Sequence, residues 1–320
     1  MVKFGVKIMI GQGGLTYDTI RNAWLDCERL GFDSIWLYDH LFPYTKPKED
    51  CLEGWVTMSS LCCQCNRIRF GILVTANTFR HPALLAKMAS TLDVISGGRL
   101  EFGIGAGALE AEHRAYGIPF PDAATRIAQL DESLEIIKRM WTEEKTSFSG
   151  KYFTVNNAIN YPKPVQKPHP PIVIGGLGRK LLRVAAKHAD VYNADIFTSP
   201  NEFQKRISIL TEICRGVGRN PKEIEKTIFS MVSVADTTEA AKNKVEMCIK
   251  EAGLSEVVSK RDPKFESVIY GTPKKCVEKI EQYIQVGVEG FILVFPLFPQ
   301  IYEIRPLKLF IKEVMPQFQN

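Results

Sequence analysis

Short runs of apolar, often β-branched residues alternate with amphipathic segments along almost the whole chain. Residues 70–76 begin one such unit: the run breaks at Asn77, His81 and Pro82 open a helix, and a second apolar run starts at Leu100. Apolar strands joined by helices are typical of a parallel sheet, because parallel neighbours need a crossover connection. The pattern therefore predicts repeated βα units.

Eight such strands are predicted, each followed by at least one helix. We expect them at residues 3–10, 34–38, 70–76, 100–104, 172–174, 191–192, 228–234 and 291–295. Eight βα units in 320 residues fit a single (β/α)8 barrel, which we expect to form one domain over residues 1–320. Residues 145–171, rich in aromatic residues and prolines, break the rhythm after the fourth unit, and we interpret them as an extended or hairpin insertion.

A doubly wound open sheet is the alternative fold. Its dinucleotide-binding turn would follow the first strand, where the chain has Gly11, Gly13 and Gly14. These glycines lack the G-x-G-x-x-G spacing, and no ribose-binding acid stands out after them. The barrel is therefore the preferred prediction.

Composition and charge narrow the possible functions. A hydrophobic content of 45% allows a large core, and the net charge of +5 is spread along the chain, so we expect no nucleic-acid partner. The amino terminus lacks the pattern of a signal peptide, and no apolar run approaches the roughly 20 residues that cross a membrane. Together with eight cysteines, these features predict a cytoplasmic protein with reduced thiols and no membrane contact.

Candidate ligand-binding residues follow three of the predicted strands, since parallel barrels hold ligands at the carboxyl ends of their strands. Thr75 and Asn77 end the third strand, and Gly105 and Gly107 end the fourth, where glycine lets a flat ring approach the backbone. The fifth strand runs into a turn and a helix start made of Gly175, Gly176, Leu177, Gly178 and Arg179. Glycines, a helix N-terminus and a basic residue together favour a phosphate, although a tight βα turn would have the same pattern.

Asp39 and His40 follow the second strand and are the candidates for catalysis. A histidine there can donate or take a proton near neutral pH, and the adjacent carboxylate could orient its ring; alternatively, the histidine only bonds a loop carbonyl. Glu110 is a further cofactor-binding candidate, unless it and Glu112 form the solvated first turn of a helix. No metal-binding pattern such as H-E-x-x-H occurs, so no metal is predicted.

These residues, taken with four longer segments, resemble the bacterial luciferase-like superfamily, and within it the branch that depends on coenzyme F420, a deazaflavin. The segments are LVTANTFRHPALLAKMASTLDVISGGRLEFGIGAG, EAEHRAYGIPFP, YPKPVQKPHPPIVIGGLG and GVEGFILVFP. The resemblance covers essentially the whole chain.

The resemblance implies a (β/α)8 barrel with the cofactor at its carboxyl face. A non-prolyl cis peptide bond, here Leu73–Val74, would press against the cofactor ring, and Thr75 and Asn77 would reach the ring or its side chain. The turn over residues 175–178 would bind the cofactor phosphate, with Arg179 nearby. His40 matches the active-site histidine, and a homodimer is expected.

The implied reaction is hydride transfer between the deazaflavin and a small organic substrate such as an alcohol, an enone or a pterin. His40 would exchange the substrate's proton, oriented by Asp39. Ala108 stands where the sugar-phosphate dehydrogenases have an acid, so glucose 6-phosphate is not the expected substrate. Two alternatives stay open: a monooxygenase that uses flavin mononucleotide (FMN), and a barrel that binds a flavin without catalysis.

Overall fold

Eight parallel strands close a barrel in the computed structural model, which describes residues 2–8, 15–43, 48–296 and 304–319. Each strand pairs with the next, β9 pairs with β10, and β12 returns to β1. The strands are β1 (Lys3–Lys7), β2 (Ser34–Leu37), β3 (Arg69–Ile72), β5 (Leu100–Gly105), β8 (Ile172–Gly175), β9 (Val191–Ala194), β10 (Glu225–Val234) and β12 (Gly290–Val294). The predicted (β/α)8 fold is confirmed.

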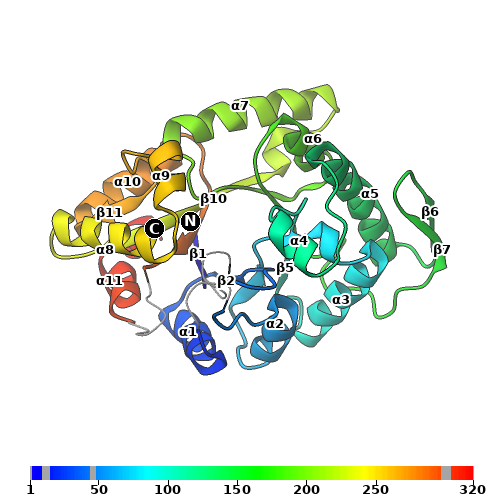
Figure 1. Cartoon of the computed structure of the whole chain (residues 1–320), viewed down its shortest axis with the longest axis horizontal. Coiled ribbons are helices and arrows are strands. Elements are labelled where there is room, and N and C mark those ends of the chain that lie inside the picture. Colours follow the sequence, from blue (N-terminus) through cyan, green and yellow to red (C-terminus); the bar gives the residue numbers. More distant parts are fainter. Residues whose placement is uncertain (1, 9–14, 44–47, 297–303, 320) are drawn as a thin grey trace.

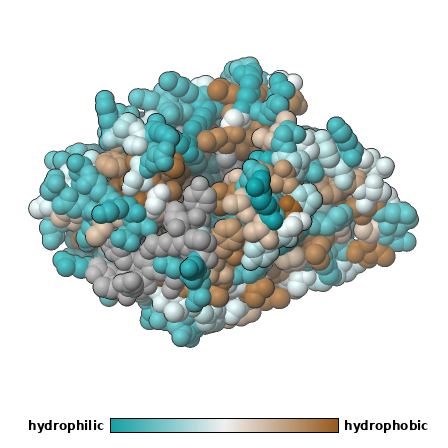
Figure 2. All heavy atoms as spheres, viewed as in Figure 1, coloured by the Kyte–Doolittle hydropathy of each residue, from teal (hydrophilic) through white to brown (hydrophobic). Residues whose placement is uncertain are grey.

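Helices surround the barrel (Figure 1), and their apolar sides pack on its outer surface. They are α1 (Tyr17–Leu30), α2 (Gly54–Cys62), α3 (Pro82–Ile95), α4 (Glu110–Ala115), α5 (Ala123–Thr142), α6 (Arg179–His188), α7 (Pro200–Gly216), α8 (Thr238–Glu251), α9 (Ser255–Arg261), α10 (Pro273–Gln285) and α11 (Arg305–Glu313). No helix in the described ranges is both long and apolar enough to cross a membrane. Hydrophilic atoms dominate the rim of the face seen in Figure 2, and apolar atoms gather nearer its middle.

The predicted third strand is divided in two. After β3, the Leu73–Val74 peptide bond is cis, as the resemblance implied. The chain then resumes as β4 (Thr75–Ala76), which pairs with β5, and passes through a short 3-10 helix, η1 (Asn77–Phe79), into α3. The cis bond therefore lies at the carboxyl end of the barrel, between strands β2 and β5.

Three short elements lie outside the barrel. The segment 145–171 contains an antiparallel hairpin of β6 (Thr146–Ser149) and β7 (Thr154–Ala158), which projects beyond α5 in Figure 1. A three-residue strand, β11 (Ile269–Gly271), pairs in parallel with the carboxyl-terminal end of β10, and the sequence pattern did not predict it. The predicted end of the first strand and the glycines at 11, 13 and 14 lie outside the described residues.

A tryptophan fills the middle of the barrel. Trp36 on β2 is 1% exposed, and its indole Nε1 donates to the Ser34 hydroxyl at 2.9 Å. A Cβ atom on Gly71 of β3 would lie 2.6 Å from this indole ring, so only glycine leaves room for it there. Because Trp36 occupies the interior, the space for a ligand lies above it, at the carboxyl ends of the strands.

Candidate active site

A cavity of about 490 Å³ opens at the carboxyl ends of the barrel strands. Its walls come from residues in or soon after seven strands, β1, β2, β3, β5, β8, β9 and β10, and helices α4 and α5 close one side. Of the predicted site residues, nine line it: Asp39, His40, Leu73, Val74, Gly105, Gly107, Gly175, Gly176 and Leu177. The sequence therefore placed most of the predicted residues at one site.

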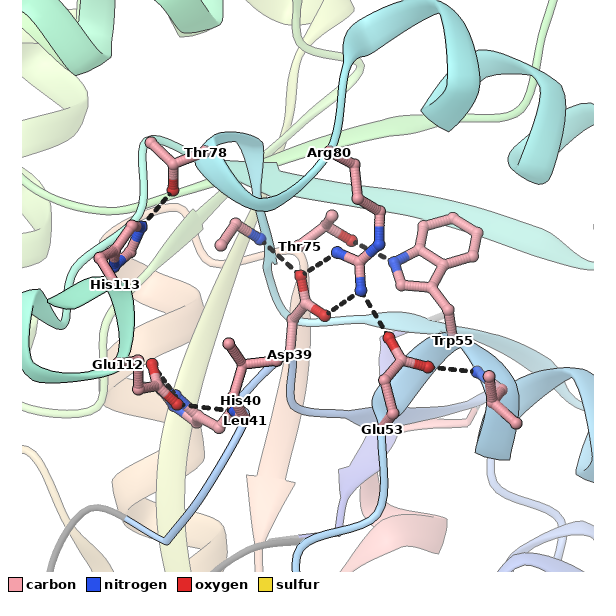
Figure 3. A network of polar contacts seen from close by, with 12 residues as sticks. Asp39, His40, Leu41, Glu53, Trp55, Thr75, Thr78, Arg80, Glu112 and His113 are labelled. Atoms are coloured by element: carbon pink, nitrogen blue, oxygen red, sulfur yellow. Dashed lines mark hydrogen bonds and ion pairs between the residues drawn. The ribbon is translucent and has the colours of Figure 1, made fainter. Parts of the chain in front are cut away.

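His40 is paired with a buried glutamate. Its ring nitrogen Nδ1 lies 3.1 Å from each carboxylate oxygen of Glu112 on α4, and the Leu41 backbone N–H donates to the same carboxylate at 2.7 Å (Figure 3). The Glu112 side chain is 2% exposed, whereas that of His40 is 30% exposed. With Glu112 as the acceptor, Nδ1 of His40 carries a proton and Nε2 is left to exchange one with a ligand.

Asp39 does not orient His40, so that part of the prediction was wrong. Both oxygens of its buried carboxylate accept from the Arg80 guanidinium, at 2.7 and 2.9 Å, and one also accepts from the Ala76 backbone N–H at 2.9 Å (Figure 3). Arg80 in turn contacts Glu53, which caps the start of α2. Asp39 thus joins the end of β2 to β4 and, through Arg80, to α2. Its oxygens are already engaged by two donor groups, so they are not available to the histidine.

Val74 explains two of the predicted glycines. A Cβ atom on Gly105 would lie 2.7 Å from the Val74 side chain, and one on Gly175 would lie 2.9 Å from it. Val74 therefore sits between the ends of β5 and β8, on the wall of the cavity. The two glycines make room for this valine, and the valine then presents the surface on which a flat ring could lie.

The turn after β8 lines the cavity only in part. Leu177 and the two preceding glycines face it, but Gly178 is the N-cap of α6, where its φ of +93° favours glycine. Arg179 is half-exposed and pairs with Glu212 on α7 at 2.7 Å. Two other basic residues do line the cavity, Lys7 at the end of β1 and Arg126 on α5, and the Nε atom of Arg126 is buried without a hydrogen-bond partner among the described residues.

Three more predicted residues lie away from the cavity wall. The Thr75 hydroxyl accepts from the Trp55 indole at 3.2 Å, on the α2 side of the strand (Figure 3). Glu110 is exposed and pairs with Arg114 one turn later in α4. Asn77 is 2% exposed, and neither polar atom of its amide has a partner among the described residues. A buried, unpartnered amide at the end of β4 is the kind of group that a ligand satisfies.

Comparison with known proteins identifies the family. The sequence profile of the family described as luciferase-like monooxygenase matches residues 1–290. The chain belongs to this luciferase-like family. It is 26% identical to an F420-dependent glucose-6-phosphate dehydrogenase of Microbacterium testaceum, over 100% of this chain and 98% of that protein. It is 30% identical to an FMNH(2)-dependent dimethylsulfone monooxygenase of Pseudomonas putida, over 57% of this chain and 47% of that protein.

A solved structure extends the likeness to the whole luciferase-like barrel. An F420-dependent secondary alcohol dehydrogenase in complex with an F420-acetone adduct superimposes with a TM-score of 0.84 at 20% identity, over 100% of this chain and 99% of that one. The predicted family is confirmed, and the expectation of an oxidoreductase is confirmed by the enzymes among which the chain falls.

Sequence reasoning missed three residues of this luciferase-like site. Glu112 was named only in the alternative of a solvated helical turn, although it pairs with His40. Lys7 at the end of β1 and Arg126 on α5 were not considered, although both line the cavity. In the described ranges no group of three or more His, Cys, Asp or Glu side chains could hold a metal ion.

Proposed function

We propose that this luciferase-like chain is a coenzyme F420-dependent oxidoreductase that transfers a hydride between the deazaflavin and a small alcohol or its ketone. The observation that carries the proposal is the His40–Glu112 pair, which lies at the same cavity as the cis Leu73–Val74 bond. One group can exchange a proton, and next to it an apolar wall is shaped for a flat ring. Alcohol oxidation needs both.

The residues present fit a deazaflavin or a flavin. Val74, seated between Gly105 and Gly175, would support one face of the ring. The unpartnered Nε of Arg126 would donate to a polar group of the cofactor, and Arg126 with the turn after β8 would hold its phosphate. When bound, the deazaflavin supplies the hydride acceptor or donor.

The chain's own contribution is the movement of one proton. In the direction of oxidation, Nε2 of His40 accepts the hydroxyl proton while the substrate carbon loses its hydride. Glu112 accepts the hydrogen bond from Nδ1 and stabilises the positive charge that forms on the ring. The Glu112 carboxylate is itself shielded from water, so the stabilisation is larger than it would be between two surface side chains.

The substrate we propose is small and largely apolar. Phe79, Leu109 and Ile127 line the same cavity as His40, and Ala108 follows Gly107 without adding an acidic group. We propose that glucose 6-phosphate is therefore not the substrate, as the sequence predicted.

Cofactor titration tests the proposed function. Purified protein is titrated with oxidised F420 and with FMN while fluorescence quenching is followed, and turnover is then measured with secondary alcohols and with glucose 6-phosphate. We expect tight binding of F420, reduction of F420 by an alcohol, and loss of that reduction in His40→Ala. Tight binding of FMN alone would favour the monooxygenase, and His40→Ala with full turnover and intact cofactor binding would contradict the proposed role of His40.

We also propose that the chain forms a homodimer, which the resemblance implied. Exposed apolar side chains on the outer surface of α2 and α3 support it, namely Val56 (72% exposed), Leu84 (56%) and Ile95 (54%). Light scattering of the wild type and of Val56→Asp should give dimer and monomer masses respectively, and a monomeric wild type would contradict this part of the proposal.

A further inference from the structure

Lys7 carries an amino group into the active-site cavity. It is the last residue of β1 and only 4% exposed, and it lines the cavity above Trp36. Its Nζ atom donates to the carbonyl oxygen of Leu73, the oxygen of the cis peptide unit, and lies 3.5 Å from the Tyr38 ring centroid and 4.5 Å from that of Phe229. No carboxylate of the described residues forms an ion pair with it.

Folding alone does not account for this lysine. Burial of an ammonium group costs free energy unless a negative charge balances it, and burial lowers the pKa of Lys7 well below its ordinary value. A carbonyl oxygen takes one of its three N–H donors, and the faces of two aromatic rings attract its charge but do not neutralise it. An apolar side chain of similar length would fill the same volume at lower cost. The charged form of this amino group is disfavoured by its burial in the cavity, and a negative ligand would supply a partner for it, so Lys7 points to a ligand that is negative when bound.

We propose that Lys7 makes this cavity bind the reduced, negatively charged cofactor more tightly than the oxidised one. The inference rests on the proposed function. In alcohol oxidation the substrate C–H bond breaks with its electron pair, the hydroxyl proton passes to His40, and the substrate becomes a ketone. The ring gains the hydride and with it one unit of negative charge. An ammonium group in the same cavity favours that product, and it would favour the oxidised ring, which carries one negative charge fewer, to a smaller degree.

The expected effect is large enough to measure. Two unit charges a few ångströms apart, at the effective dielectric constant of a partly buried site, alter an equilibrium by roughly tenfold or more. For a two-electron couple, tenfold corresponds to about 30 mV in reduction potential. The effect of the Lys7 charge should therefore be measurable as the ratio of the dissociation constants of oxidised and reduced cofactor, without any measurement of turnover.

Four variants separate charge from structure. Lys7→Met and Lys7→Gln remove the charge, Lys7→Arg keeps it, and Lys3→Met removes a charge from the exposed end of the same strand, where Lys3 pairs with Glu225. Each variant is titrated with oxidised and with reduced F420 without oxygen, and the thermal unfolding of each cofactor-free protein is recorded. We expect Lys7→Met and Lys7→Gln to lose roughly tenfold in the preference for reduced over oxidised cofactor, while Lys7→Arg and Lys3→Met keep it. Cofactor-free Lys7→Met should unfold at the wild-type temperature or above.

Each result decides the matter. An unchanged preference in Lys7→Met or Lys7→Gln would overturn the role of Lys7 but leave the proposed function standing. A marked fall in the unfolding temperature of cofactor-free Lys7→Met, with the preference retained, would show that the lysine is structural. A wild type that binds neither form of F420 would overturn the proposed function, and this inference with it.

Discussion

Replacement of Glu112 by glutamine tests how the site moves its proton. Glu112 accepts from His40 Nδ1 at 3.1 Å and from the Leu41 backbone N–H at 2.7 Å, and its side chain is 2% exposed. Glutamine has nearly the same shape, and its carbonyl oxygen can keep the bond from Leu41. It loses the negative charge that faces the imidazole ring. The variant therefore removes the charge and keeps the packing.

The expected loss follows from the hydrogen bond that changes. A hydrogen bond to a charged group contributes about 1.5–3 kcal/mol, and this one is strongest when His40 is positively charged, in the transition state. At 1.36 kcal/mol for each factor of ten, kcat for hydride transfer should fall about 10- to 150-fold. KM should change little, because Glu112 acts through His40. The assay follows the absorbance of F420 during alcohol oxidation, under conditions that saturate the enzyme with cofactor.

Asp39→Asn is the matched control. Asp39 is buried as deeply as Glu112, but it binds Arg80 and the Ala76 backbone. Its substitution should lower the unfolding temperature by several degrees, since it weakens a buried ion pair, and should leave kcat of the folded enzyme within about threefold. The reasoning is refuted if Glu112→Gln keeps wild-type kcat, or if Asp39→Asn alone abolishes turnover without loss of stability.

Three further changes are expected to have distinct effects. Gly175→Ala would place a methyl group 2.9 Å from Val74, so cofactor affinity in titration should fall about tenfold, and adding Val74→Ala should restore part of it. Arg126→Gln should weaken cofactor binding about tenfold and Arg179→Gln less than twofold, because Arg179 pairs with α7 outside the cavity. A hydrogen bond from the buried His188 lowers the pKa of the Asp131 carboxyl to about 2. Asp131→Asn should therefore lower the free energy of unfolding in urea at pH 7 by about 1 kcal/mol, a figure reduced because Asp131 is partly exposed. The difference in unfolding free energy between the wild type and Asp131→Asn should disappear as the pH falls from about 4 to about 2, because the wild-type carboxyl then becomes protonated. A difference that stays constant over this range would contradict the prediction.

The barrel could be predicted from the sequence because each strand and helix has a local signal. Buried parallel strands are short apolar runs, and helix α6 begins at Arg179, where the sequence predicted a helix start. The weak alternation of β6 and β7 left an extended segment and a hairpin as equal predictions for the insertion, and β11, with only three residues, was not predicted. The place of Gly105 and Gly175 at the cavity could be predicted from the sequence, but the need for glycine there could not. Both accommodate the Val74 side chain, and this contact connects the segment after β3 to β5 and β8.

The partner of His40 could not be predicted because the sequence does not show which of two glutamates in the first turn of α4 faces the barrel. From the sequence, Glu110 is the candidate and Glu112 is not, although residues two apart in an α-helix point to nearly opposite sides, about 160° apart. Glu110 faces solvent, and Glu112 faces the barrel and meets a residue 72 positions earlier in the chain. Asp39 was predicted to orient His40 only because the two residues are adjacent in the sequence. Neighbouring residues in an extended segment point to opposite sides, so adjacency does not bring their side chains together.

The same argument shows how Lys7 could have been found. Side chains alternate along a strand, so Gly5 and Lys7 share one face of β1. A Cβ atom on Gly5 would meet Ser34 and Trp36 inside the barrel, which places the Lys7 side chain inside as well. A lysine on the inner face of a barrel strand, at its carboxyl end, has no solvent to reach and no structural need for its charge. Such a residue is better interpreted as part of the site than as the polar end of a strand, and the reduced-to-oxidised affinity ratio of Lys7→Gln is the measurement that distinguishes the two interpretations.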